Sequence, residues 1–277
     1  MMVTDWSTTV VWIRTDCSRH MYAKDCISPM QYLRPLGFLY GETAREAVDA
    51  KLAAWIAGGP VAFTQVEVCE RGGANKGNKL YTYGQFRETR DVDIRAVFDR
   101  ISARRVYSSG SLDYARPLIM GILNVTPDSF SDGGDFADSE RAVAHGKNMY
   151  RSGADIIDVG GESTRPGAAP VSADQEIARV GPVISSLMQA NIPLSLDTRN
   201  AEVMRAGLKL GVSFINDVSA LTHHPDAIET VGRASANVIL MHALGDPQTM
   251  QDDPSYDNVL LDVFDALEQR IETCLAH

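Results

Sequence analysis

The second half of the chain repeats one pattern five times: a short apolar run, a polar loop and a longer amphipathic segment. The apolar runs are LIMGILNV (118–125), DIIDVGG (155–161), PLSLDT (193–198), FINDVS (214–219) and NVILMH (237–242). Short, nearly continuous apolar runs are typical of parallel strands that are buried on both faces. Because they alternate with amphipathic segments, they predict an α/β fold built on a parallel sheet.

The amphipathic segments predict helices at about 139–152, 173–190, 200–210, 225–233 and 256–275. Ser139 lies where a helix N-cap belongs, and Gly153 and Gly211 lie where helices end. This pattern alone permits an open doubly wound sheet or a (β/α)₈ barrel of the TIM type. Five strands complete an open sheet but not a barrel, which usually needs about 250 residues.

A cluster of Ser, Gly and Pro at 108–117 predicts a boundary between two domains, 1–116 and 117–277. The first domain is expected to be a small α+β unit. Its predicted elements are a helix over 43–58 and strands over 61–70 and 76–84. The first 29 residues show little pattern, and we expect either a disordered tail or a true start at Met30.

Polar side chains close each of the five predicted strands. They are Asn124, Asp158 and Glu162, Asp197, Asn216 and Asp217, and His242. Ligands bind at the carboxyl ends of parallel strands, so this recurrence predicts one shared pocket. Each residue taken singly could instead cap the helix that follows it.

Two long polar loops follow the first two strands: NVTPDSFSDGGDF (124–136) and GGESTRPG (160–167). Neither matches a phosphate-binding P-loop or a dinucleotide fingerprint. Long loops after barrel strands often act as lids. The two loops are therefore candidates for substrate contacts.

The segments around these loops, MGILNVTPDSFSDGG (120–134) and GADIIDVGGESTRPG (153–167), closely resemble the two signature segments of the dihydropteroate synthase family. The resemblance continues in order through PLSLDT, GVSFINDVSAL and LMHALGDPQTMQDDPSYDNV. YLRPLGFLYG and FTQVEVCERGG resemble, more loosely, the N-terminal extension of some bacterial members. The resemblance implies a (β/α)₈ barrel and a transferase of folate biosynthesis. That enzyme condenses dihydropterin-6-ylmethyl diphosphate with p-aminobenzoate, using Mg²⁺, and releases pyrophosphate.

The resemblance also implies roles for individual residues. Asn124 would hold the magnesium–diphosphate end of the substrate, Asp197 and Asn216 would hydrogen-bond the pterin, and Met241 would line its pocket. The loop residues would close over p-aminobenzoate and the departing pyrophosphate. They are Phe130, Asp132, Thr164, Arg165 and Pro166, of which Asp132 and Arg165 are the expected catalytic residues. The family reaction needs no nucleophilic side chain, so Cys69 and His242 are expected to be structural.

The charge of residues 117–277, with 10 basic and 23 acidic side chains, argues against a nucleic-acid surface. It also leaves an anionic diphosphate short of cations. The family's sixth to eighth strands carry an Asp, Lys, Arg and His that bind pterin and pyrophosphate, and none of those segments occurs here. We therefore expect an incomplete, C-terminally truncated barrel, with a homodimer or a complementing C-terminal fragment as a possible partner.

No stretch of about 18 apolar residues and no signal-peptide pattern occurs, and the four cysteines are scattered. A cytoplasmic protein with no membrane partner is expected. An open five-stranded barrel would leave its first and fifth strands unpaired and would expose its interior, which predicts poor stability or oligomerisation.

Three functions stay open on this reasoning. The chain is a dihydropteroate synthase, alone or with a complementing fragment. It is an inactive fragment that at most binds pterin. Or it resembles the methyltetrahydrofolate-binding domain of a methyltransferase, which the NVTPDSFSDGG loop disfavours because methyl transfer has no p-aminobenzoate to cover.

Overall fold

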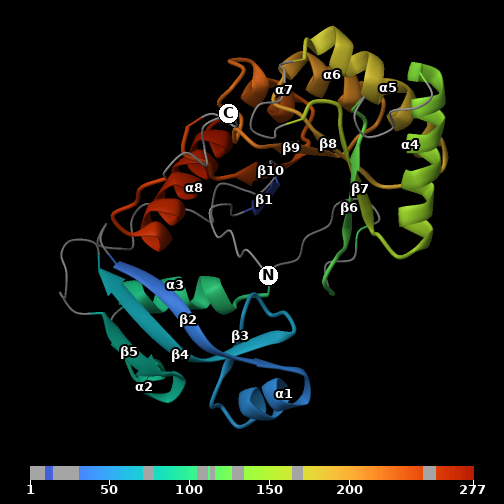
Figure 1. Cartoon of the computed structure of the whole chain (residues 1–277). Coiled ribbons are helices and arrows are strands. Elements are labelled where there is room, and N and C mark those ends of the chain that lie inside the picture. The colour runs from blue at the N-terminus through green and yellow to red at the C-terminus, as the bar shows by residue number, and fades with distance from the viewer. Residues whose placement is uncertain are drawn as a thin grey trace. The chain divides into compact units, whose positions relative to one another are not determined.

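The computed structural model describes residues 10–14, 31–70, 78–90, 92–104, 112, 116–126, 134–163, 171–245 and 254–277 (Figure 1). The chain divides into two compact units. The larger contains Met1–Ser18, Ser109–Leu112 and Leu118–His277, and the smaller contains Arg19–Ser108 and Asp113–Pro117. No helix in the described part of the chain is long and apolar enough to cross a membrane.

The larger unit is built on five parallel strands that pair in sequence order. They are β6 (Met120–Asn124), β7 (Ile156–Gly160), β8 (Leu194–Asp197), β9 (Phe214–Asp217) and β10 (Asn237–Met241). The helices that follow them are α4 (Gly134–Arg151), α5 (Ala173–Gln189), α6 (Ala201–Lys209), α7 (Ala227–Arg233) and α8 (Val259–Leu275). This is the predicted succession of five βα units.

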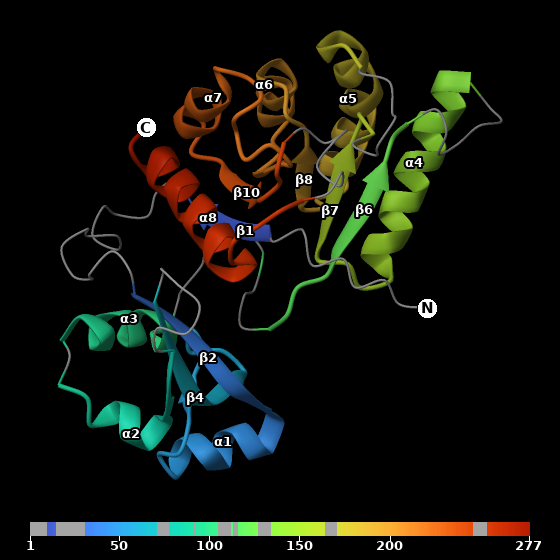
Figure 2. The same cartoon turned by 60° about the vertical axis from the view of Figure 1, so that its left-hand side comes forward.

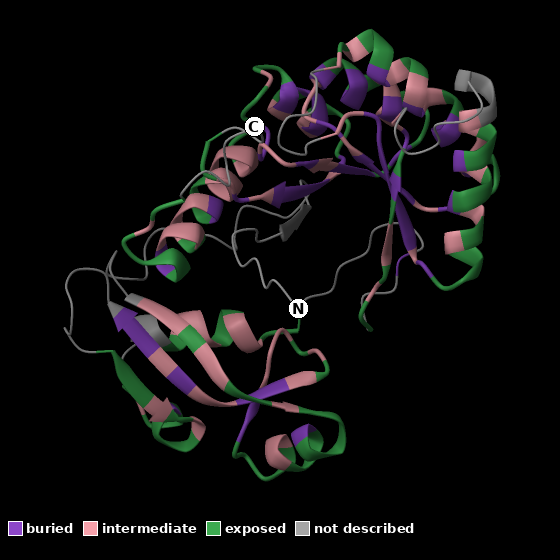
Figure 3. Cartoon of the chain, in the orientation of Figure 1, coloured by how far each residue is buried: buried purple, intermediate pink, exposed green. Residues whose placement is uncertain are grey.

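All five helices contribute to one core against one face of the sheet (Figures 1 and 2). Alternate residues of each strand pack into that core. Leu123, Ile157, Leu196, Ile215 and Leu240, one from each strand, lie in it. An open doubly wound sheet carries helices on both faces, whereas a barrel carries them only outside. The unit is therefore an incomplete (β/α) barrel, as predicted. Figure 3 shows the burial concentrated along the strands and on the sides of the helices that face them.

The concave face opposite the helices is unevenly covered. At β6 the side chain of Ile122 is 67% exposed, whereas Phe214 on β9 and Ile239 on β10 are almost fully buried. The expectation of an open interior thus holds at the β6 end of the sheet.

An antiparallel strand, β1 (Val10–Arg14), pairs with β10 in a register that joins Val10 to Met241 and Arg14 to Asn237. The sequence analysis assigned no element to these residues and placed them with the N-terminal domain. It also expected the outer edge of the fifth parallel strand to be unpaired, which is wrong, because β1 satisfies the backbone groups of that edge. No described strand pairs with the outer edge of β6.

The smaller unit is an α+β fold around an antiparallel sheet in the order β2 (Gln31–Tyr40), β4 (Val61–Glu70), β3 (Ala54–Trp55), with β5 (Lys79–Thr82) also pairing with β4. Its helices are α1 (Gly41–Asp49), α2 (Tyr83–Arg87) and α3 (Val92–Ser102). An aromatic core holds it together: the ring of Phe98 lies 5.7 Å from Phe63 and 5.0 Å from Phe86.

Two predictions for this unit are wrong in their bounds. The helix expected over 43–58 ends at Asp49, because Lys51 and Gly58 adopt positive φ angles of 60° and 66° that no right-handed helix contains. The strand expected over 76–84 ends at Thr82, whose hydroxyl accepts a hydrogen bond from the backbone N–H of Gln85 and so starts α2.

Candidate active site

Four residues from four neighbouring strands form a row across the carboxyl end of the barrel sheet. The register joins Asn124 to Gly160, Gly160 to Asp197, and Asp197 to Asn216. Register partners in a parallel sheet point to the same face, and this row alternates with the residues that pack against the helices. The row therefore lies on the concave face, where a barrel holds its ligands.

Gly160 leaves a gap in this row between two polar side chains. A Cβ atom at this position would lie 3.5 Å from Asp197 Oδ2 and 3.6 Å from Asn124 Oδ1. Because glycine has no side chain, it leaves space between the two oxygens, although Gly160 itself is buried. This glycine falls in both the predicted strand over 155–161 and the predicted loop over 160–167, and it was given no role because nothing in the sequence gives its register.

A second row of polar residues lies on the same face of the sheet, two positions earlier along the strands. The Asn216 amide donates to Asp158 Oδ2 at 2.9 Å. Asp158 Oδ1 and the hydroxyl of Ser195 are buried and have no partner in good hydrogen-bonding geometry, although the Ser195 hydroxyl lies close enough to Asp158 to lower its pKa. Unsatisfied buried polar atoms cost free energy unless water or a ligand reaches them. They mark this face as a polar binding surface, and Ser195 was missed because a serine inside an apolar run carries no signal.

The two carboxyl groups of this face, Asp197 and Asp158, have raised pKa values. Burial raises the pKa of Asp197 well above its usual value, and the negative charges of Asp158, Asp217, Glu176 and Glu162 raise it further. Burial also raises the pKa of Asp158, and the Ser195 hydroxyl and the Asn216 amide oppose this. A neutral carboxyl can donate one hydrogen bond and accept others, which suits a ligand edge that alternates donors and acceptors.

Asp217 does not belong to this surface, although the sequence analysis placed it in the shared pocket. It lies on the opposite face of β9, where its carboxylate accepts hydrogen bonds from Ser219 N, Ser219 Oγ and Leu221 N at 2.7, 2.7 and 3.0 Å. The Arg270 guanidinium donates to the carbonyl oxygen of Ala220 at 2.9 Å from the other side. Ala220 and Leu221 have positive φ angles, so these contacts hold a strained turn.

His242 also has a structural partner. Its Nε2 lies 3.1 Å from the Tyr256 hydroxyl, and burial lowers the pKa of the imidazole. Met241, the residue before it, lines a cavity of about 560 Å³ between the turn after β9, the end of β10 and α8. Arg199, His223 and Arg270 also line this cavity.

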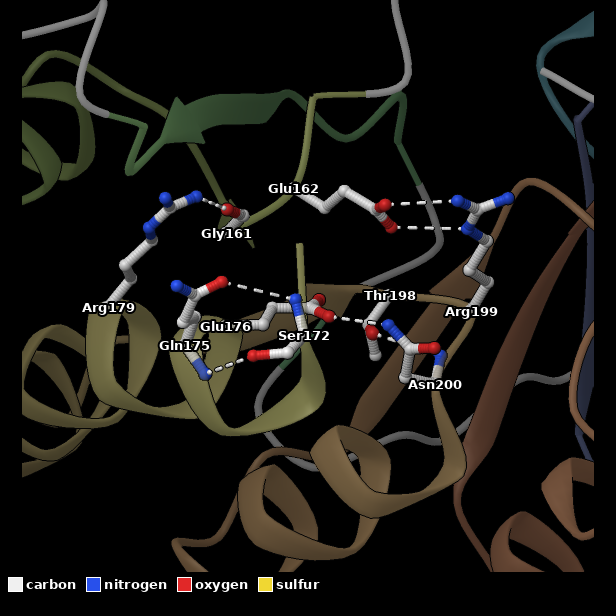
Figure 4. Close-up of polar contacts among 9 residues, drawn as sticks. All are labelled: Gly161, Glu162, Ser172, Gln175, Glu176, Arg179, Thr198, Arg199 and Asn200. Carbon is white, nitrogen blue, oxygen red and sulfur yellow. Dashed lines mark hydrogen bonds and ion pairs between the residues drawn. The ribbon is translucent and has the colours of Figure 1, made fainter. Parts of the chain in front are cut away.

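A polar network joins the ends of β7 and β8 (Figure 4). Arg199 pairs with Glu162, and the Asn200 amide donates to Glu176 Oε2 at 2.7 Å. Arg179 donates to the carbonyl oxygen of Gly161 at 2.9 Å. Sequence reasoning identified Glu162 as a strand-end residue but assigned no role to its partners, because these contacts join residues 18 to 37 positions apart.

The structure thus brings Asn124, Asp197 and Asn216 together in one row, and Met241 lies at the same end of β10. The other predicted site residues, Phe130, Asp132, Thr164, Arg165 and Pro166, lie outside the described residues.

No group of three or more His, Cys, Asp or Glu side chains in the described ranges could hold a metal ion. A magnesium ion bound mainly by phosphate oxygens and water needs only one or two protein oxygens. Asn124 fits that need, because its side chain is exposed and its amide oxygen faces the gap at Gly160.

Comparison with known proteins places this site in a family context. Residues 120–277, more than half of the chain, match the family of pterin binding enzymes. The dihydropteroate synthase of Escherichia coli K12 is 46% identical over 172 residues, which are 61% of this chain and 61% of that protein. The chain thus spans about three fifths of the length of this relative.

Solved structures agree with the sequence matches. The Yersinia pestis dihydropteroate synthase with a sulfonamide drug complex superposes with a TM-score of 0.57 at 43% identity, over 61% of this chain and 62% of that one. The Xanthomonas albilineans dihydropteroate synthase with 4-aminobenzoic acid gives a TM-score of 0.52 at 47% identity, over 57% of this chain and 56% of that one.

Proposed function

The chain belongs to the family of pterin-binding enzymes, and from this premise we propose that it serves dihydropteroate synthesis. In this reaction p-aminobenzoate displaces pyrophosphate from dihydropterin-6-ylmethyl diphosphate. The observation that carries the proposal is the row of Asn124, Gly160, Asp197 and Asn216 at the carboxyl end of the barrel. The similarity to named synthases supports it.

The pterin is read by hydrogen bonds. Its flat edge alternates donors and acceptors, and Asp197 and Asn216 offer both kinds of group on one concave face. A site whose polar groups are buried rejects a ligand that leaves them unpaired. Met241 lines the pocket beside the ring.

In the chemical step, the methylene carbon of the pterin exchanges its diphosphate group for the amine of p-aminobenzoate. The C–O bond to the diphosphate breaks, a C–N bond to the amine of p-aminobenzoate forms, and the amine loses a proton. Asn124 would hold Mg²⁺ together with diphosphate oxygens, and the ion would neutralise charge on the departing pyrophosphate. Phe130, Asp132, Thr164, Arg165 and Pro166 would cover p-aminobenzoate and exclude water.

The barrel described here offers five of the eight strands that a closed barrel contains. We propose a complementing C-terminal fragment with further cations as a partner of this site. A homodimer is the alternative assembly, and the cytoplasm is the proposed compartment. The alternative function is pterin binding without turnover.

Incubation with pterin diphosphate, labelled p-aminobenzoate and Mg²⁺ tests the function. We expect labelled dihydropteroate once a chain that supplies three further βα units is added. In that mixture Asn124→Ala should lower the rate roughly 10- to 100-fold through the loss of a magnesium ligand. Pterin binding without product, both with and without the added chain, would favour the alternative function of pterin binding without turnover. A chain that binds no pterin would contradict both functions.

Gly160→Val should weaken pterin binding about tenfold or more with little loss of stability. Gly160 has no positive φ angle, and its Cβ would make only ordinary contacts, so the methyl groups fill the ligand space between Asn124 and Asp197. Calorimetric titration with 6-hydroxymethylpterin measures the affinity.

Gly207→Ala provides the matched control. A Cβ there would overlap Leu196 Cδ2 in the core on the helix side of the sheet, so this change should lower stability instead of affinity. The steric account of Gly160 is wrong if its valine variant binds pterin as tightly as the native chain.

A further inference from the structure

The three residues that follow Asp197 each bind a different neighbouring element. Thr198 N donates to the carbonyl oxygen of Asn216 on β9 at 3.0 Å. Arg199 binds Glu162 after β7, and Asn200 binds Glu176 on α5 (Figure 4).

Arg199 makes the charged contact of the three, and it is a two-point contact. Its Nε donates to Glu162 Oε2 at 3.1 Å and its Nη2 donates to Glu162 Oε1 at 3.0 Å. The side chains are only 18% and 7% exposed. A fork-to-fork pair sets orientation as well as distance, and low exposure keeps it from being screened by solvent.

The Asp197 carboxyl itself accepts no hydrogen bond from any described residue, in contrast to Asp158 and Asp217. Its placement must therefore come from the backbone on either side of it. The ion pair of Arg199 with Glu162, called the clamp below, holds that backbone just after Asp197. The Glu162 end of the clamp lies two residues beyond Gly160, the register partner of Asp197.

The Glu162 end is anchored independently of Arg199. Arg179 holds the carbonyl oxygen of Gly161, and the absence of a side chain at Gly161 lets the chain lie against Val180 and Glu176. Loss of the pair therefore loosens the turn after Asp197, which Thr198 and Asn200 still hold, while the end of β7 stays in place.

We propose that Arg199 is a positioning residue for pterin recognition: through its two-point contact with Glu162 it fixes the turn that aims the Asp197 carboxyl at the ligand. The inference deepens the proposed function and rests on it. Arg199 acts on the pterin only through Asp197.

Arg199→Lys tests geometry against charge, because lysine keeps the charge and loses the second hydrogen bond. Affinity for 6-hydroxymethylpterin, measured by calorimetry, should fall about tenfold in Arg199→Lys and in Glu162→Gln. The reversed pair Arg199→Glu with Glu162→Arg should recover most of the loss. Arg205→Gln, which removes the exposed ion pairs of Arg205 with Glu202 and Asp226, is the matched control and should leave pterin affinity unchanged.

A double-mutant cycle separates positioning from general structural damage. On an Asp197→Asn background, Arg199→Lys should cost less than twofold in affinity, because the side chain through which Arg199 acts is already changed. An undiminished loss on that background overturns the proposal. Native affinity in Arg199→Lys would mean that charge alone suffices, and it overturns the proposal too.

Hydrogen exchange supplies a readout that needs no ligand. Arg199→Lys should speed exchange at the amides of Thr198 and Asn200, and the reversed pair should slow it again. If the native chain binds no pterin, the proposed function fails. The exchange rates then still show whether the ion pair of Arg199 with Glu162 holds the turn. Unchanged exchange in Arg199→Lys would then refute it.

Discussion

Asp197→Asn is expected to stabilise the protein at pH 8 and to remove most of its pterin affinity. The Asp197 carboxyl is surrounded by other acidic groups and accepts no hydrogen bond from the described residues, so its ionised form is unfavourable. Asparagine has nearly the same shape and no charge. We expect a gain of about 1–2 kcal/mol in the free energy of unfolding, and a melting temperature higher by roughly 2–8 °C.

The sign of the pH dependence follows from the raised pKa. The folded state holds the Asp197 proton more tightly than the unfolded state, whose pKa is near the usual 3.8. Between that value and the folded pKa, unfolding releases a proton, so the native chain loses stability as pH rises. The difference between Asp197→Asn and the native chain should be small below pH 4 and largest above the folded pKa.

Asp197→Asn should lower the affinity for pterin, although it raises stability. An amide cannot change its protonation state to match the ligand edge, and one mismatched polar contact in a buried site costs roughly 10- to 100-fold. Calorimetry with 6-hydroxymethylpterin and thermal melts from pH 4 to 9 measure both effects. Asp257→Asn, at an exposed position, is the control. A destabilised Asp197→Asn that keeps its pterin affinity would refute both parts.

Asp217→Ala should destabilise the protein by about 2–4 kcal/mol, although Asp217 is the residue next to Asn216. Its carboxylate accepts three hydrogen bonds, and its loss leaves Ser219 N, Ser219 Oγ and Leu221 N without an acceptor. Each unsatisfied buried donor costs roughly 1–3 kcal/mol, and the costs of neighbouring groups do not add fully.

Urea denaturation measures the loss. Ser219→Ala removes the hydrogen bond that Ser219 Oγ donates to Asp217 and the one that it accepts from His223 N, and should cost about 1 kcal/mol. Burial raises the pKa of both carboxyl groups, although Asp217 is fully buried and Asp197 only partly. They differ in their hydrogen bonds, and so the predicted changes in stability have opposite signs. Equal stability of Asp217→Ala and the native chain would show that the turn after β9 does not depend on this carboxylate.

The contrast between Asp197 and Asp217 shows where sequence reasoning reaches its limit. Both residues end a predicted strand, and the sequence analysis placed both in one pocket. The alternation of side chains along β9 sends Asn216 to the concave face and Asp217 to the helix side, so a difference of one position decides the role.

The sequence by itself determined the five βα units and the strand-end positions of Asn124, Asp197 and Asn216. These follow from periodicity and caps, which depend on residues close together in the chain. The family resemblance is equally local, because it rests on uninterrupted segments.

Only the tertiary structure decided that all five helices lie on one face, that Gly160 opens a gap between Asn124 and Asp197, and that Arg199 binds Glu162. It also placed β1 along β10 and ended α1 at Asp49. The physical reason is that sheet curvature, strand register and ion pairs join residues far apart in the chain. Their energies depend on the distances and directions between those residues, which no local pattern of residue types contains.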